Sequence, residues 1–146
     1  MNEEALTAWG MQIGRTVETP AIFALRGDLG AGKSVLARAI ARGAGVSAPM
    51  PSPTFNLLYR YDADRGVEVV HIDLYRLERM DEVWELGWRE LGRENQIVLI
   101  EWPERAEAIL PEPRWDIFLD MDTPETRTIH LARIGAAPDL PPLPAS

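Results

Sequence analysis

Residues 27–34 read Gly-Asp-Leu-Gly-Ala-Gly-Lys-Ser, which matches the phosphate-binding P-loop pattern G-x-x-x-x-G-K-[ST]. The glycines of such a loop let the backbone turn so that successive N–H groups point at a phosphate, and the helix that follows presents its positive end. In this arrangement the Lys33 ammonium bridges the outer phosphates and the Ser34 hydroxyl is a ligand of Mg²⁺. The pattern therefore predicts a nucleotide site.

The surroundings of the loop support this interpretation. An apolar run at 21–26 predicts a buried strand and the pattern at 35–41 predicts a helix, which is the order that a P-loop requires. A glycine-rich turn matches the motif by chance in roughly 1 in 200 chains of this length. Lys33 is the only lysine, and an ammonium and a guanidinium are not interchangeable against phosphate. We assign the nucleotide contacts to Asp28, Leu29, Gly30, Ala31, Gly32, Lys33, Ser34 and Val35.

Length and composition limit the organisation of the chain. Its 146 residues, 46% of them hydrophobic, suit one domain over 1–135, followed by a proline-rich tail at 136–146 that we expect to be disordered. The net charge of −8 opposes a non-specific hold on nucleic acid, which depends on Lys and Arg against phosphates. If the chain acts on a nucleic acid, we therefore expect a partner protein to make the contact.

The chain has no cysteine, which excludes disulfides and thiolate metal sites. Its acidic start, Met1-Asn2-Glu3-Glu4, does not fit a signal peptide, and no run approaches the roughly 20 apolar residues of a membrane span. We expect a soluble, cytoplasmic protein with no membrane partner.

Hydrophobic periodicity predicts the other elements. Helices are expected at 3–16, packed on the sheet, and at 81–92, while the P-loop helix should end near Gly43 and Gly45. Trp84 and Trp88 would then lie on one side of their helix, in the core or at a partner-docking surface. Strands are expected as a hairpin of 55–61 and 67–73, a buried strand at 97–100, and an antiparallel pair of 115–121 and 127–134.

Three further regions carry candidate site residues. The prolines of 49–54 predict a loop, either a stiff connector or a switch segment with Ser52 or Thr54 near Mg²⁺ and the last phosphate. Asp73 ends an apolar strand, as a Walker B aspartate does. Glu101 ends the strand at 97–100, where it is either placed for metal or water or simply solvated. We interpret His71 as an ordinary strand residue, because it lacks acidic or histidine neighbours at metal spacing.

Four blocks occur together in this order and spacing in one family: residues 27–34, Ser52-Pro53-Thr54, His-Ile-Asp-Leu-Tyr-Arg-Leu at 71–77, and Glu101-Trp102-Pro103. The chain resembles the TsaE (YjeE) family, small bacterial ATPases needed to make threonylcarbamoyladenosine in tRNA. The resemblance covers roughly residues 5–133. Two departures from its pattern are Ser34, where threonine is frequent, and Phe55-Asn56, which replace a common Tyr-Thr pair.

The resemblance implies a P-loop α/β domain with a mixed sheet flanked by helices, which binds ATP and Mg²⁺ and hydrolyses ATP slowly. It also implies a complex with the tRNA threonylcarbamoyl transferase and its companion protein, through which tRNA is reached indirectly. For the nucleotide site, the resemblance implies that Lys33 binds phosphate, that Ser34 and Glu101 bind Mg²⁺, and that Asp73 supports catalysis. It also implies that Thr54 belongs to a switch segment with Ser52 and Pro53. Trp102 would shape the site or contact a partner. Thr7 and Arg127 are candidate adenine contacts.

The hypothesis that follows is a nucleotide switch. ATP binding and hydrolysis would order and release residues 49–56 and so reset the tRNA-modifying complex, with weak activity in the chain alone. The alternative is a small-molecule or nucleoside kinase that uses the same P-loop, although no arginine-rich lid is evident. A GTP switch is disfavoured, because the guanine-reading Asn-Lys-x-Asp motif needs a second lysine.

Overall fold

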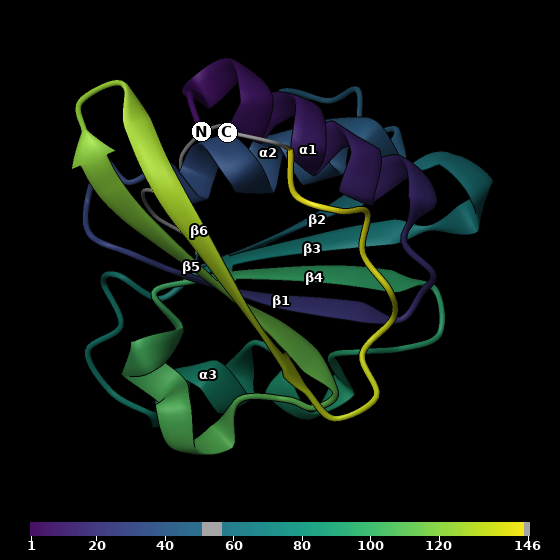
Figure 1. The fold of residues 1–146 in the computed structure, drawn as a ribbon. Helices are drawn as coiled ribbons and strands as arrows, with labels where there is room; N and C mark the ends of the chain where they lie inside the picture. The colour runs from purple at the N-terminus through teal and green to yellow at the C-terminus, as the bar shows by residue number, and fades with distance from the viewer. Residues whose placement is uncertain (51–56, 145–146) are drawn as a thin grey trace.

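Four parallel strands form the centre of the sheet in a computed structural model of the chain, which describes residues 1–50 and 57–144. The strand order is β2-β3-β4-β1-β5-β6, with the edge strands β2 and β6 antiparallel to their neighbours (Figure 1). The bounds are β1 Ala21–Arg26, β2 Leu58–Asp62, β3 Glu68–Asp73, β4 Gln96–Glu101, β5 Arg114–Thr123 and β6 Thr126–Ile134. The predicted hairpin, within the described residues, and the final antiparallel pair are confirmed.

The central strands bring the predicted site residues to one edge of the sheet. Every residue of β4 is buried, as expected of a parallel strand that is covered on both faces. In the register of the sheet, Glu101 lies opposite Leu25 on one side and Asp73 on the other. The carboxyl ends of β1, β3 and β4 therefore meet where the P-loop begins.

Two helices, α1 Glu3–Thr16 and α2 Lys33–Ala44, cover one face of the sheet (Figure 1). Their backbones touch: a Cβ at Gly14 would lie 2.0 Å from the Ile40 carbonyl oxygen. The helix predicted at 3–16 therefore packs chiefly against α2, although its buried side chains share a core with β1. In the described parts of the chain, no helix is long and apolar enough to cross a membrane.

The opposite face carries short elements, and the helix predicted over 81–92 is wrong. Helix α3 spans only Asp81–Glu85, because Gly87 adopts a left-handed conformation (φ 81°) that ends the helical path; a 3₁₀ turn follows at Trp88–Glu90. Trp88 is buried and donates to the Ile109 carbonyl (2.8 Å), whereas Trp84 is 43% exposed. The two indoles therefore do not share a side.

The proline-rich tail, described through Pro144, contacts the folded domain. It runs from β6 along the molecule to the helical layer and ends near the N-terminus (Figure 1). The indole N–H of Trp9 donates to the Pro141 carbonyl (3.1 Å) and that of Trp115 to the Pro138 carbonyl (2.7 Å). Proline lacks an N–H but keeps its carbonyl, so these residues can serve as acceptors for the two indole donors.

Removing residues 138–146 should lower the free energy of unfolding by about 2 kcal/mol, because two indole N–H groups lose their acceptors. Urea unfolding followed by tryptophan fluorescence measures the change. A Pro138→Ala/Pro141→Ala chain keeps both carbonyls and should lose less than half as much. If the truncated chain is as stable as the parent, the tail contacts do not contribute.

Candidate nucleotide-binding site

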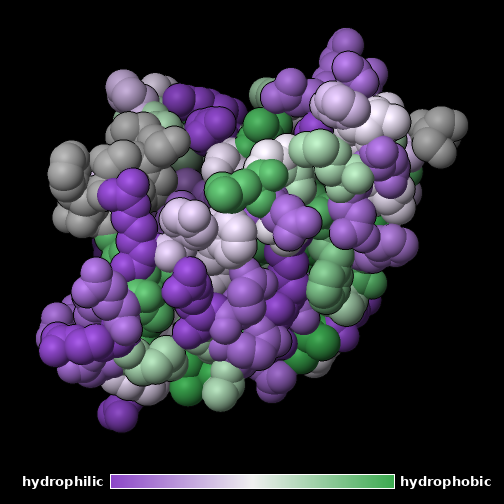
Figure 2. All heavy atoms as spheres, turned by 90° about the vertical axis from the view of Figure 1, so that its left-hand side faces the viewer, coloured by the Kyte–Doolittle hydropathy of each residue, from purple (hydrophilic) through white to green (hydrophobic). Residues whose placement is uncertain are grey.

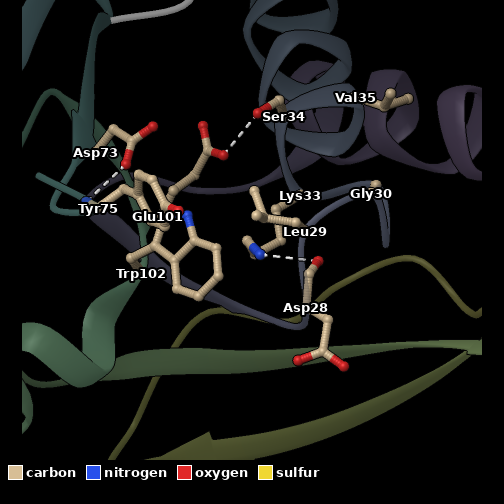
Figure 3. Close-up of a pocket in the computed structure, with 11 residues that line it drawn as sticks. Asp28, Leu29, Gly30, Lys33, Ser34, Val35, Asp73, Tyr75, Glu101 and Trp102 are labelled. Atoms are coloured by element: carbon tan, nitrogen blue, oxygen red, sulfur yellow. Dashed lines mark hydrogen bonds between the residues drawn. The ribbon is translucent and has the colours of Figure 1, made fainter. Parts of the chain in front are cut away.

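A cavity of about 240 Å³ lies between the P-loop and the carboxyl ends of β3 and β4 (Figure 3). It joins segments that are up to 74 residues apart in sequence, from Asp28 to Trp102, and includes most of the predicted site residues. The lining consists of Asp28, Leu29, Gly30, Gly32, Lys33, Ser34, Val35, Asp73, Tyr75, Glu101 and Trp102.

The P-loop backbone fits an anion. Gly30 and Gly32 have positive φ (83° and 110°), which L side chains rarely adopt. Gly32 is the N-cap of α2 and supplies no side-chain acceptor, so the N–H groups of the first helical turn remain available to a ligand. A Cβ at Gly32 would also lie 2.8 Å from a guanidinium nitrogen of Arg127. The loop therefore requires glycine and presents the donor set that phosphate needs.

Lys33 points into the cavity from the start of α2 (Figure 3). Its Nζ donates to the carbonyls of Gly27 and Asp28, the latter at 3.1 Å, and lies 3.8 Å from the centre of the Trp102 ring. Burial lowers the pKa of Lys33, against the opposing effect of Glu101 and other nearby carboxylates. The ammonium is thus held by loop carbonyls and an aromatic face.

Trp102 has a left-handed backbone (φ 57°, ψ 48°), which costs an L residue about 1–2 kcal/mol. This conformation places its indole against Lys33 and 4.9 Å from the Tyr75 ring, measured between centroids. Strain of this kind gathers at functional sites. Here it turns the chain immediately after Glu101 and closes one wall of the cavity.

Ser34 and Glu101 form the candidate metal centre. The Ser34 hydroxyl donates to Glu101 Oε1 at 2.7 Å, and both side chains carry the oxygen ligands that Mg²⁺ prefers. In the part of the chain that the structure describes, no group of three or more His, Cys, Asp or Glu could hold a metal. The pair would therefore bind Mg²⁺ together with phosphate oxygens and water, as is usual for this ion.

Glu101 is 2% exposed, and its other oxygen, Oε2, lies 2.5 Å from Nε2 of His71. Burial opposes ionisation of Glu101, but the hydrogen bond and charge of His71, the Ser34 hydroxyl and the Lys33 charge outweigh it and lower the pKa of this carboxyl. The interpretation of His71 as an ordinary strand residue missed this contact. A signal was available, because His71 and Asp73 are two apart in a strand and share its face.

Asp73 ends β3 on the wall of the cavity and accepts a hydrogen bond from the Tyr75 N–H (2.9 Å). Burial raises the pKa of Asp73, and the negative charge of Glu101 adds to the effect, against the lowering effect of the Tyr75 N–H, His71 and Lys33. A carboxylate that the fold disfavours in its charged form points to a functional role rather than a stabilising one.

The family model for the threonylcarbamoyl adenosine biosynthesis protein TsaE matches residues 1–129. This chain belongs to the TsaE family. A TsaE protein of Treponema pallidum is 33% identical over 124 residues, which cover 85% of this chain and 90% of that protein. One of Haemophilus influenzae is 41% identical over 98 residues, 67% of this chain and 60% of the relative. The crystal structure of Bacillus subtilis YdiB has a TM-score of 0.66 and 25% identity, covering 92% of this chain and 82% of YdiB.

These comparisons confirm the resemblance and the α/β P-loop fold of this TsaE-family chain. The TsaE family takes part in the biosynthesis of threonylcarbamoyladenosine in tRNA.

The remaining predicted site residues of the TsaE-family chain are less closely grouped. Thr7 lines a second cavity, of about 330 Å³, and Val35 lines both this cavity and the first. Arg127 is buried behind Gly32 and lines neither of these two cavities. The predicted switch residues Ser52, Pro53 and Thr54 lie outside the described residues.

Replacing Asp73 with asparagine should raise the Tm of the nucleotide-free chain at pH 7 by about 2 °C. The pKa of Asp73 is raised in the folded state, so its ionised form at neutral pH opposes folding, and asparagine removes this cost while keeping an acceptor for Tyr75. The increase in Tm of Asp73→Asn over the parent should decline as the pH falls through the raised pKa of Asp73, and it should vanish below the ordinary value of 3.8. Differential scanning calorimetry from pH 3 to 8 measures the difference in Tm between Asp73→Asn and the parent.

The control is Asp120→Asn, which alters an exposed carboxylate 3.8 Å from His130 and should leave Tm within about 1 °C of the parent. A lower Tm for Asp73→Asn at pH 7 would mean that the Asp73 charge stabilises the fold.

Proposed function

We propose that this chain binds and hydrolyses ATP with Mg²⁺, slowly when alone, as the nucleotide-driven component of the complex that forms threonylcarbamoyladenosine next to the anticodon of tRNA. The observation that carries the proposal is the 2.7 Å contact between the Ser34 hydroxyl and Glu101, at the start of α2 and beside the single lysine of the chain. Family membership supports the tRNA role.

In the proposed reaction, Lys33 exchanges the Gly27 and Asp28 carbonyls for phosphate oxygens, and the first N–H groups of α2 bind the phosphate from the other side. Ser34 and Glu101 hold Mg²⁺, which when bound neutralises phosphate charge. Asp73 supports catalysis from the end of β3, where its carboxylate can accept a hydrogen bond from the attacking water. Thr7 would contact the adenine, because Val35 lines both its cavity and the cavity at the P-loop. Arg127 would act through Gly32, against which its guanidinium lies.

The partners we propose are the tRNA threonylcarbamoyl transferase and its companion protein, in the cytoplasm. Figure 2 shows the face on which the P-loop and the β5–β6 turn emerge, with apolar areas among hydrophilic side chains. Leu29 in the P-loop is 68% exposed and Met121 of β5 is 47% exposed. Exposed apolar side chains at the cavity mouth support a partner that contacts the nucleotide site, together with Trp102 and the segment that contains Ser52, Pro53 and Thr54.

The deciding experiment is mass-spectrometric nucleoside analysis of tRNA from cells depleted of this protein and complemented with the parent chain or with Lys33→Ala. The proposal predicts that threonylcarbamoyladenosine is lost and that only the parent restores it. Isothermal titration of the purified chain with ADP, ATP and GTP tests the nucleotide site separately.

Two results would contradict the proposal. Undiminished modification after verified depletion would remove the tRNA role. Nucleotide binding with phosphate transfer to a small acceptor rather than to water would favour a kinase that uses the same P-loop.

A further inference from the structure

His71 is the buried polar side chain next to the candidate metal centre that the proposed reaction leaves without a role. It lies on β3, pairs with Leu99 of β4 in the sheet register, and is 2% exposed. Leu99 and Glu101 are two residues apart on β4, so His71 and Glu101 lie on the same face of the sheet. This is the face that α2 and Ser34 cover.

Among the residues that the structure describes, the Glu101 carboxylate has one hydrogen-bond partner on each oxygen. Oε1 accepts from the Ser34 hydroxyl at 2.7 Å, and Oε2 lies 2.5 Å from His71 Nε2. A carboxylate that is only 2% exposed cannot turn to water for a replacement donor. The hydrogen bond between His71 Nε2 and Oε2 therefore fixes the orientation of the carboxylate, and with it the direction in which Oε1 points.

The other ring nitrogen, Nδ1, is buried and finds no hydrogen-bond partner among the described residues. An unpaired buried polar atom costs stability, so a histidine whose only role is to pack in the core should have a hydrogen-bond partner on both ring nitrogens. The one hydrogen bond that the ring makes in the described chain is thus directed at the candidate Mg²⁺ ligand.

We propose that His71 is a positioning residue: it holds Glu101 in the orientation in which Oε1 faces the Ser34 hydroxyl, and it thereby sets the affinity of the nucleotide site for Mg²⁺. Side chains that hydrogen-bond to a carboxylate ligand without binding the metal themselves orient that ligand, and their loss typically weakens metal binding 10–100-fold. The inference rests on the proposed Mg²⁺–nucleotide site, but it assigns a role that the reaction itself does not require of His71.

The test is calorimetric titration with ADP at increasing Mg²⁺ concentrations, for the parent, His71→Leu and His71→Gln. Leucine removes the donor to Oε2, whereas the glutamine amide can replace Nε2 as a donor. The Mg²⁺ concentration that gives half of the gain in ADP affinity should rise about tenfold in His71→Leu and less than threefold in His71→Gln. Affinity for ADP in EDTA should stay within about twofold in all three chains, because Lys33 and the loop N–H groups are unchanged.

The outcomes distinguish a failure of the proposed nucleotide site from a failure of the role of His71. A parent chain that binds no ADP, or whose binding ignores Mg²⁺, overturns the proposed site and the role of His71 with it. A parent with Mg²⁺-dependent binding and a folded His71→Leu chain with the same Mg²⁺ midpoint overturns only the role of His71. An equal loss in His71→Leu and His71→Gln also overturns it, because the donor would then not matter.

A measurement on the parent covers the case in which His71→Leu does not fold. The chain has two histidines, and His130 has a side chain that is 64% exposed, so ¹⁵N-histidine labelling gives an NMR spectrum with a built-in reference. The Nε2 proton of His71 should stay hydrogen-bonded and protected from exchange in the ADP–Mg²⁺ complex. Loss of this proton signal on Mg²⁺ binding would contradict the proposal.

Discussion

Replacing Lys33 with alanine should lower the rate of ATP hydrolysis at least about a hundredfold and weaken ATP binding. Lys33 is the only lysine, and its Nζ already lies at the P-loop carbonyls of Gly27 and Asp28, where the phosphates would enter. No other ammonium can take its place. Steady-state phosphate release measures the loss of hydrolysis, and calorimetric titration with ATP measures the loss of binding.

Two further variants control this result. Lys33→Arg should remain strongly impaired, because a planar guanidinium fits poorly in a cradle shaped for a compact ammonium. Arg93→Ala removes an exposed ion pair with Glu90 (3.1 Å) and should leave hydrolysis unchanged. Hydrolysis by Lys33→Ala within threefold of the parent would exclude the P-loop as the active site.

Replacing Glu101 with glutamine should lower Mg²⁺-dependent hydrolysis by about two to three orders of magnitude, because the site loses the charged oxygen ligand beside Ser34. Nucleotide binding in EDTA should be as tight as in the parent or tighter, since a buried negative charge no longer faces the phosphates. Rates measured over a range of Mg²⁺ concentrations, and ADP titration in EDTA, separate the two effects.

The matched control is Glu112→Gln, which changes an exposed glutamate 3.7 Å from Arg114 and should alter neither quantity. Because the pKa of Glu101 is lowered in the fold, its ionised form stabilises the chain at neutral pH, and this contribution is lost as the pH falls below the ordinary glutamate range. Loss of binding in EDTA would mean that Glu101→Gln damages the fold, and unchanged Mg²⁺ activation would remove Glu101 from the metal centre.

Several predictions from the sequence agree with the structure because the relevant interactions are local. The helix at 3–16 follows from apolar spacing, and α1 has those bounds. Gly45 ends α2 in a left-handed conformation, as a glycine just past a helix usually does. The apolar run at 97–100 forms a strand that is buried on both faces.

Contacts between residues distant in sequence are a different matter, and one predicted helix is wrong. Residues 81–92 contain enough apolar side chains for a helix, but the left-handed Gly87 separates Trp84 from Trp88, and the indole of Trp88 donates to the distant Ile109 carbonyl. In the tail, the Pro141 carbonyl accepts from the indole of Trp9, 132 residues away in sequence. Neither contact has a local signal.

The sequence by itself determined the family and the P-loop, and it named Lys33, Ser34, Asp73 and Glu101 as candidate site residues, because motif residues carry their chemistry in short-range order. Only the tertiary structure decided that Ser34 and His71 hold opposite oxygens of Glu101. These three residues come from α2, β3 and β4, up to 67 positions apart, and strand order and register bring them together. Such contacts depend on how the layers pack, which no local pattern specifies.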